Sequence, residues 1–235
     1  VATLIAHPAR PFLSQDLADR ALHTLGASHI DWLSPRVAAD ISLPEGLTQA
    51  EASSRLATLL AGEPVDHAVQ VAATRRKKLL IADMDSTMID QECIDELADE
   101  VGLKEHVADI TARSMNGELA FEPALRERVA LLAGLEVGVI ARIIENRITL
   151  ASGGKTLVAT MNAAGSWTAL VSGGFLSFTG PIAAKLGFQE NRANVLIEED
   201  GRLAGKVAEP ILGRAAKAEA LTEMTARLGI SVEEA

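Results

Sequence analysis

The sequence is poor in aromatic and basic residues, and these shortages argue against a nucleic-acid partner. Phe, Trp and Tyr make up 3% of the 235 residues, and Tyr is absent. Side chains on which single-stranded bases could stack are therefore scarce. Acidic residues outnumber basic ones by 32 to 22, and the resulting net charge of −10 repels polyanions. We expect no DNA or RNA to bind.

Cysteine and long apolar runs are also nearly missing. The one cysteine, Cys93, cannot form an internal disulfide, and the first residues lack the basic stretch and apolar core of an export signal. No apolar run approaches the roughly 18 residues of a membrane helix. We therefore expect a soluble, cytoplasmic protein with no membrane partner. Acidic neighbours raise the pKa of a thiol, so we do not expect Cys93 to be a nucleophile.

The chain has enough apolar residues, 48%, to bury a sizeable core. Residues 1–75 alternate short apolar runs with helix-like stretches at 14–26 and 48–62. This pattern predicts a small α+β unit, with a sheet and two helices on one face. The charged run at 74–78 is typical of a solvated linker.

From Leu79 onward the pattern predicts a parallel sheet. The run LLIAD at 79–83 is typical of a strand buried on both faces, and WTALV at 167–171 is a second one. Residues 93–146 have helical spacing over a length too great for one crossover, which indicates an inserted helical domain. We also expect a helix at 153–165, a hairpin with an Asp-Gly turn within 194–211, and an amphipathic helix at 213–229.

Several short segments do not match the functional motifs that they partly resemble. The run Gly153-Gly154-Lys155-Thr156 is not a phosphate loop, because Thr149 stands where the first glycine should be. The five histidines have no metal-ligand spacing. The sequence before Ser172 lacks the glycine that a nucleophile elbow needs, so acyl transfer is weakly supported.

The informative motif is Asp83-Met84-Asp85, directly after a predicted buried strand. Two carboxylates there are costly to desolvate unless a cation shares the site, although capping a helix or lying in solvent is an alternative. One carboxylate could attack phosphorus, and the other could protonate the leaving oxygen and then activate water.

Phosphate-binding groups follow in the order that such chemistry needs. Ser172 and the amides of Gly173 and Gly174 come after the second predicted strand, so they can reach the same crevice and hold phosphoryl oxygens. Lys217, on the last predicted helix, can supply a positive charge. Each feature alone is common, but the ordered combination is much more specific.

This order resembles the haloacid dehalogenase superfamily, and four segments resemble its phosphoserine phosphatases: DMDSTMIDQECIDELADEVG, ARSMNGELAFEPALRERVALL, VSGGF and AAKAEAL. The resemblance covers roughly residues 79–235. It implies a Rossmann-like α/β core at 76–91 and 150–235, with a helical cap at 92–149. The implied reaction is hydrolysis of O-phospho-L-serine to L-serine, the last step of serine biosynthesis, through an aspartyl phosphate and with Mg²⁺.

The resemblance also implies a role for each matching residue. Asp83 would be the nucleophile, Asp85 the general acid and base, and Ser172, Gly173 and Lys217 the phosphate-binding residues. In the cap, Glu92 would meet the amino group of the substrate, Arg128 its carboxylate, and Met115 and Phe121 would form an apolar lid. Phosphoserine has two anionic groups and one cationic group, which matches two cations and one anion. Without the resemblance, Glu92 and Arg128 would be taken as exposed charges.

The sequence departs from this family in one respect. Members continue into an acidic loop that supplies another metal-binding carboxylate, and no segment here matches it. The protein ligands for Mg²⁺ would be the Asp83 carboxylate and the Asp85 backbone carbonyl, so we expect weak metal binding. Residues 1–75 resemble the amino-acid-binding modules called ACT, which implies an amino-acid effector. A homodimer, a related phosphatase or phosphotransferase, and a catalytically silent regulatory chain remain alternatives.

Overall fold

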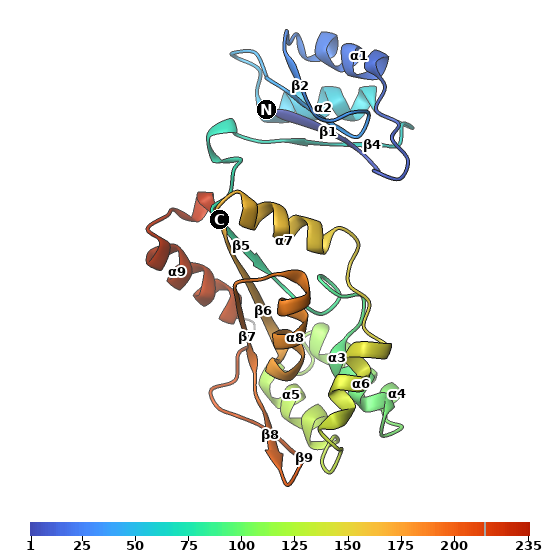
Figure 1. Ribbon diagram of the computed structural model, residues 1–235, viewed down its shortest axis with the longest axis vertical. Coiled ribbons are helices and arrows are strands. Elements are labelled where there is room, and N and C mark those ends of the chain that lie inside the picture. The colour runs from blue at the N-terminus through green and yellow to red at the C-terminus, as the bar shows by residue number, and fades with distance from the viewer. Residues whose placement is uncertain (214) are drawn as a thin grey trace. The chain divides into compact units, whose positions relative to one another are not determined.

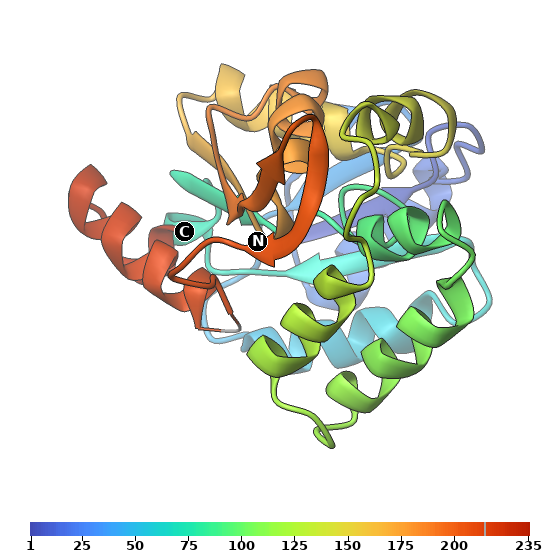
Figure 2. The same ribbon diagram turned by 90° about the horizontal axis from the view of Figure 1, so that it is seen from below.

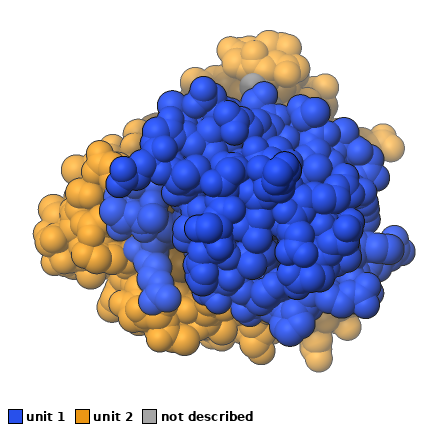
Figure 3. Space-filling model, turned by 90° about the horizontal axis from the view of Figure 1, so that it is seen from above, with its two compact units in different colours: residues 1–76 blue, residues 77–235 orange. Residues whose placement is uncertain are grey.

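The computed structural model describes residues 1–213 and 215–235, apart from the side chain of Met115. It divides into two compact units, Val1–Arg76 and Lys77–Ala235, which Figure 3 colours blue and orange. Each unit has a hydrophobic core of its own. Within the described residues, none of the helices is both long and apolar enough to cross a bilayer.

The first unit is an antiparallel sheet with two helices. Its elements are β1 (Ala2–Ala6), α1 (Gln15–Leu25), β2 (Ile30–Ser34), β3 (Ala38–Ile41), α2 (Gln49–Leu59) and β4 (Val65–Val69). The strands are ordered β2-β3-β1-β4. Leu4 of β1, Leu17 of α1 and Leu56 of α2 share one core, so both helices cover the same face of the sheet (Figure 1). This is the arrangement that the sequence pattern predicted.

The second unit contains a parallel sheet between helices. In its described part, β5 (Leu79–Ala82), β6 (Trp167–Phe175) and β7 (Glu190–Asn194) are ordered β5-β6-β7. Leu79 and Val171 pack against α9 (Ala216–Leu228), while Leu170 faces the core shared by α7 (Gly154–Ala163) and α8 (Leu176–Leu186). Figures 1 and 2 show α9 across the sheet from α7 and α8. The parallel α/β core is therefore as predicted.

Four helices separate β5 from α7 along the chain. They are α3 (Cys93–Asp99), α4 (Lys104–Met115), α5 (Phe121–Ala130) and α6 (Gly138–Asn146). The buried side chains Leu97, Val107, Leu125 and Ile143 come from these helices in turn and join the main core of the unit. The helical spacing in the sequence therefore reflects this one shared core.

A hairpin and two short 3-10 helices complete the chain. In the hairpin, β8 (Leu196–Glu199) pairs antiparallel with β9 (Arg202–Val207). Its turn residues Asp200 and Gly201 have φ values of 50° and 74°, which fits the predicted Asp-Gly turn. The 3-10 helices span Ala72–Thr74 and Val232–Glu234.

The strand predicted at 167–171 is longer in the structure, and two observed elements, α8 and β7, were not predicted. β6 runs to Phe175, so Ser172, Gly173 and Gly174 lie within the strand, near its end. The pairing of β6 with β7 shifts register there. α8 was missed because Gly180 and Pro181 lower its helical propensity. β7 was missed because its sequence, ENRAN, is polar and does not alternate.

Candidate active site

A cavity of about 860 Å³ opens in the second unit at the ends of β5 and β6. Its lining includes nine of the ten residues that the sequence analysis singled out: Asp83, Asp85, Glu92, Phe121, Arg128, Ser172, Gly173, Gly174 and Lys217. The tenth, Met115, has its side chain outside the described residues. Residues far apart in the sequence are thus brought to one site.

Asp83 follows β5, and its two carboxylate oxygens have different partners. Oδ1 accepts a hydrogen bond from the main-chain N–H of Met84 at 2.9 Å. Oδ2 forms an ion pair with Nζ of Lys217, at the start of α9. The main chain therefore orients this carboxylate, and the ammonium lies where it could also reach oxygens of a group bound to it.

Asp85 accepts hydrogen bonds from α3 and from β6. Its Oδ1 accepts a hydrogen bond from the Cys93 N–H at 2.8 Å, and its Oδ2 accepts one from Ser172 Oγ at 3.3 Å. Burial raises the pKa of Asp85, against the opposing effect of the bonds to Cys93, and the negative charges of Glu92 and Asp83 add to the rise. A carboxyl group that readily holds a proton can act as a general acid.

The end of β6 is closely fitted around Ser172. The hydroxyl of Ser172 is buried, and it accepts a hydrogen bond from the Gly174 N–H at 2.9 Å. A Cβ atom on Gly174 would lie 2.8 Å from Asp85 Oδ2 and 3.1 Å from Ser172 Oγ. Only glycine therefore fits at position 174 without moving a neighbour.

Asn194 is a positioning residue that the sequence analysis missed. It lies at the end of β7 with 2% of its surface exposed, and its Nδ2 donates to the carbonyl oxygens of Gly173 at 2.8 Å and Leu212 at 3.2 Å. Its Oδ1 accepts from the Leu212 N–H at 2.7 Å. Asn194 thus ties the end of β6 to the segment before α9. The available signal was a polar residue before the apolar run of β8.

The helical side of the cavity carries Glu92 and Arg128. Glu92 Oε1 accepts a hydrogen bond from Oγ of Ser86 at 2.6 Å, and Ser86 has a φ of 50°, which is unusual for a residue other than glycine. Arg128, 7% exposed, donates from Nε to the Ala124 carbonyl at 3.1 Å and from Nη1 to Thr111 Oγ1 at 3.0 Å. These bonds fix a guanidinium group and a carboxylate group on the same wall.

Burial lowers the pKa of Arg128, and the negative charges of Asp95 and Glu92 oppose that shift. Arginine nevertheless stays protonated in proteins at neutral pH. The wall therefore presents the positive charge of Arg128 beside the negative charge of Glu92.

Phe121 joins the helical wall to the strand ends. A Cβ atom on Gly173 would lie 3.1 Å from Phe121 Cζ, and one on Gly213 would lie 3.4 Å from Phe121 Cδ1. The ring therefore covers both glycines. Ile94, Leu119 and Leu125, which the sequence analysis did not select, add apolar surface to the same cavity.

Cys93 lies against Asp85 and is buried. Burial, followed by the negative charge of Asp85, raises the pKa of the thiol. A thiol that resists ionisation is a poor nucleophile. This agrees with the prediction that Cys93 is not catalytic.

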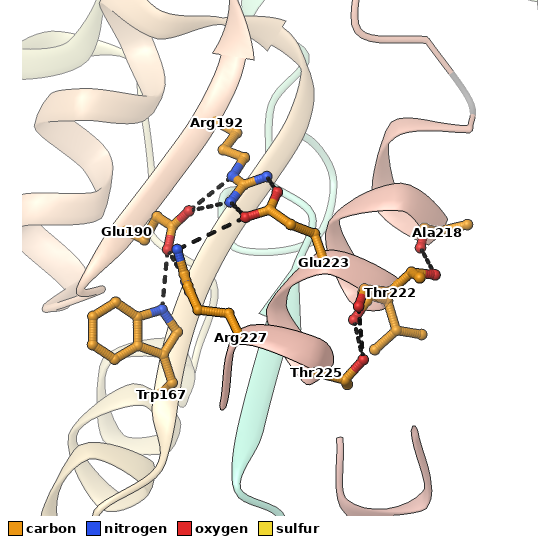
Figure 4. A network of polar contacts seen from close by, with 9 residues as sticks. Trp167, Glu190, Arg192, Ala218, Thr222, Glu223, Thr225 and Arg227 are labelled. Carbon is orange, nitrogen blue, oxygen red and sulfur yellow. Dashed lines mark hydrogen bonds and ion pairs between the residues drawn. The ribbon is translucent and has the colours of Figure 1, made fainter. Parts of the chain in front are cut away.

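A polar network fixes α9, the helix that carries Lys217, to the sheet (Figure 4). Arg192 of β7 donates to Glu223 of α9 at 2.9 Å, and Arg227 of α9 donates to Glu190 of β7 at 2.5 Å. Glu190 also accepts from Trp167 Nε1 at 3.1 Å. Desolvation tends to raise the pKa of Glu190, but bonds from Arg227, Arg192 and Trp167 outweigh it and lower the pKa.

The donor atoms at the strand ends fit Mg²⁺. Among the described residues, His, Cys, Asp and Glu form no group of three or more arranged to hold a metal. Mg²⁺ is usually held by one or two carboxylates together with water and phosphate oxygens. The Asp83 carboxylate and the Asp85 carbonyl are hard oxygen donors of that kind, so an all-protein cage is not required.

Comparison with known proteins identifies the family of this chain. A family model described as haloacid dehalogenase-like hydrolase matches residues 80–235. The chain is 34% identical over 241 residues to a phosphoserine phosphatase of Streptomyces coelicolor, covering 100% of this chain and 58% of that protein. It is 44% identical over 159 residues to a phosphoserine phosphatase of Archaeoglobus fulgidus, covering 68% of this chain and 46% of that one.

A solved structure described as a phospho-aspartyl intermediate analogue of phosphoserine phosphatase is 40% identical, with a TM-score of 0.62. The match covers 66% of this chain and 74% of that one. The chain spans about half the length of the first two curated relatives.

Proposed function

The chain belongs to the haloacid dehalogenase-like hydrolase family, and from that premise we propose that it hydrolyses O-phospho-L-serine to L-serine and phosphate. The observation that carries the proposal is the pairing of two chemistries in one cavity. Asp83, Asp85, Ser172, Gly174 and Lys217 form what we call the phosphate end, and Glu92, Phe121 and Arg128 the head-group end.

In the first proposed step, a carboxylate oxygen of Asp83 attacks phosphorus. A new bond forms between that oxygen and phosphorus while the bond from phosphorus to the serine oxygen breaks, and Asp85 gives its proton to the leaving oxygen. The raised pKa of Asp85 supports its role as the acid. Lys217 and the Ser172 hydroxyl would hold the phosphoryl oxygens in line.

In the second step, water replaces the serine. Asp85, now a carboxylate, takes a proton from water as the water oxygen attacks phosphorus, and the bond to Asp83 breaks. Phosphate leaves and both carboxyl groups return to their starting forms. When bound by Asp83 and the Asp85 carbonyl, Mg²⁺ would supply charge stabilisation for the phosphoryl oxygens.

The head-group end provides the selectivity in this proposal. Phosphoserine carries an ammonium and a carboxylate beyond its phosphate, and Glu92 and Arg128 offer the opposite charge to each. Arg128 is already fixed by Thr111 and Ala124, so it can use its remaining N–H groups for a carboxylate without losing further freedom. The Phe121 ring would limit the length of the substrate.

We further propose that residues 92–149 act as a cap on a core formed by 76–91 and 150–235. Residues 1–75 would be an ACT-like regulatory domain that binds an amino acid, and the single cysteine fits a reducing cytoplasm. Thermal unfolding of the chain with each amino acid in turn tests the effector site. An effector would raise the melting temperature of the wild type.

The test of the activity is phosphate release from phosphoserine with Mg²⁺ present. We expect kcat/KM for phosphoserine to exceed that for 3-phosphooxypropanoate, which lacks the ammonium, and for phosphoethanolamine, which lacks the carboxylate. Adding an acceptor alcohol separates hydrolysis from phosphoryl transfer, because transfer would yield a new phosphate ester. Equal turnover of all three compounds would contradict the proposed substrate.

A further inference from the structure

Asp95 is a partly buried acidic residue to which the proposed mechanism assigns no role. It lies in the first turn of α3, next to the cavity residue Ile94. Its Oδ1 is buried and has no hydrogen-bond partner among the described residues. A carboxylate oxygen left in this state is costly to bury, and such an atom in a folded protein calls for an explanation.

The neighbouring acid, Glu96, is paired. Its carboxylate lies 3.1 Å from Lys104 Nζ and 3.3 Å from Arg147 Nη1. Those cations cancel much of its charge locally. The described residues form no ion pair with Asp95, so its field extends further than that of Glu96.

Asp95 lies three residues after Glu92, the N-cap residue of α3, so the two carboxylates are neighbours on one side of the helix, next to the head-group end. Burial, and then the negative charge of Glu92, raises the pKa of Asp95. The positive charges of Arg128 and, more weakly, Lys104 oppose the shift. Asp95 and Glu92 in turn are the two groups that favour the charged form of Arg128. With both acids ionised, Glu92, Asp95 and Arg128 together carry one net negative charge.

We propose that Asp95 is a specificity-determining residue that makes the head-group end prefer phosphate esters carrying an ammonium group over esters carrying only a carboxylate. This inference rests on the proposed function. With Glu92 and Arg128 alone, the two charges would cancel and an anionic ester could bind to Arg128 with little repulsion. Asp95 adds attraction for an ammonium and repulsion for a carboxylate, and specificity depends on that difference.

The test compares Asp95→Asn with Glu96→Gln, a matched control in the same helix that removes the same charge from a paired carboxylate. We would measure kcat/KM for phosphoserine, phosphoethanolamine and 3-phosphooxypropanoate. Dissociation constants from calorimetry, with every variant in an Asp83→Asn background that blocks turnover, provide a second readout. Thermal unfolding shows whether each variant is folded.

In Asp95→Asn we expect the preference for phosphoethanolamine over 3-phosphooxypropanoate to fall roughly 30-fold. One unit charge acting over ~8 Å through an effective dielectric constant of about 40 changes the binding of each ester about fivefold, in opposite directions for the two esters. The preference for phosphoserine over 3-phosphooxypropanoate should fall in the same direction. Glu96→Gln should leave both ratios within about twofold of the wild type, because its charge is already cancelled.

If Asp95→Asn left the ratio of kcat/KM for phosphoethanolamine and 3-phosphooxypropanoate unchanged, the inference would be overturned. Asp95 would then only stabilise the N-terminus of its helix. The same shift in Glu96→Gln would also overturn it, since any charge change on α3 would then suffice. If the wild type itself shows no preference for an ammonium group, the proposed substrate fails instead, and the two failures are distinguishable.

Discussion

The two ends of the cavity are held in place by different kinds of hydrogen-bond partner. At the phosphate end, main-chain N–H groups of Met84, Cys93 and Gly174 hold Asp83, Asp85 and Ser172 respectively. At the head-group end, side-chain hydroxyls take a larger part. The Ser86 hydroxyl donates to Glu92, while Arg128 donates to the Thr111 hydroxyl and to the Ala124 carbonyl.

Because of this difference, a single substitution should alter the choice of substrate more easily than the geometry around phosphate. Main-chain donors remain whatever side chain the residue carries. The geometry of the phosphate end therefore depends on the backbone after β5, at the start of α3 and at the end of β6. The head-group end depends on side chains, and a single substitution there can change which ester binds. We therefore expect changes at the phosphate end to affect all substrates alike, and changes at the head-group end to discriminate among them.

The largest effect should come from the two aspartates. Asp83→Asn should abolish turnover of every phosphate ester, because the amide cannot form the aspartyl phosphate. Asp85→Asn should lower kcat by about 10²–10⁴-fold, the usual contribution of general acid and base catalysis. Phosphate release measured on phosphoserine and phosphoethanolamine checks both, and retained activity in Asp83→Asn would contradict the mechanism.

The next effect compares adjacent glycines. The new Cβ of Gly174→Ala would meet Asp85 Oδ2 at 2.8 Å, an atom whose carboxylate is fixed by the main chain. Such a shift of a catalytic group should lower kcat by about 10²-fold for all substrates. In Gly173→Ala the contact is the end of the Phe121 ring, which can turn aside, so we expect a smaller loss.

Steady-state kinetics of the two alanine variants, together with their melting temperatures, tests this order. If Gly173→Ala proved as damaging as Gly174→Ala, the phosphate end would depend on the whole end of β6 rather than on the contact with Asp85.

A discriminating effect is expected from Arg128→Ala. The lost guanidinium would have made charge-assisted bonds to the substrate carboxylate, typically contributing about 1.5–3 kcal/mol. The value of kcat/KM should therefore fall about ten- to a hundredfold for phosphoserine and much less for phosphoethanolamine. Arg128→Lys, which keeps the charge but not the fork of donors, is the matched control and should lose less. Equal losses on both substrates would show that Arg128 only supports the fold.

The sequence predicted most of the fold because its strongest patterns are local. The apolar run at 79–82 and the helical spacing of 93–146 both correspond to observed elements, and the turn at Asp200-Gly201 requires positive φ values that its residues tolerate. β7 and α8 were not predictable in this way. β7 is polar and is made a strand by pairing with β6, while α8 is kept helical despite Pro181 by the burial of Phe178 and Ile182.

The residues of the candidate site also differ in how far the sequence could predict them. Asp83, Asp85 and Ser172 could be proposed from their positions near strand ends, because parallel strands bring such residues to one edge. Glu92 and Arg128 needed the family resemblance, since charged residues on helices are usually solvated. Asn194 was marked in the sequence only by a polar residue before an apolar run, and its contacts with Gly173 and Leu212 appear only in the fold. The unpartnered oxygen of Asp95 likewise appears only in the fold.

The smallest effect should come from the network behind the cavity, which extends the comparison to a region outside both ends. Glu190→Gln removes the charge to which Arg192, Arg227 and Trp167 donate, and the Glu190 side chain is 19% exposed. We expect a loss of about 1 kcal/mol and a melting temperature lower by about 2–4 °C. Because Ala220 and Met224 keep α9 packed on the sheet, kcat/KM should stay within about twofold of the wild type.

The effect of Glu190→Gln on the melting temperature should depend on pH. The pKa of Glu190 is lower in the folded protein than its ordinary value of 4.5. Its charge therefore stabilises the fold above about pH 4.5, and that stabilisation is lost as the pH falls through the folded pKa. The difference in melting temperature between wild type and Glu190→Gln should be full at pH 7 and should shrink below about pH 4.5. A difference that stays constant down to pH 3 would mean that Glu190 acts through packing rather than charge.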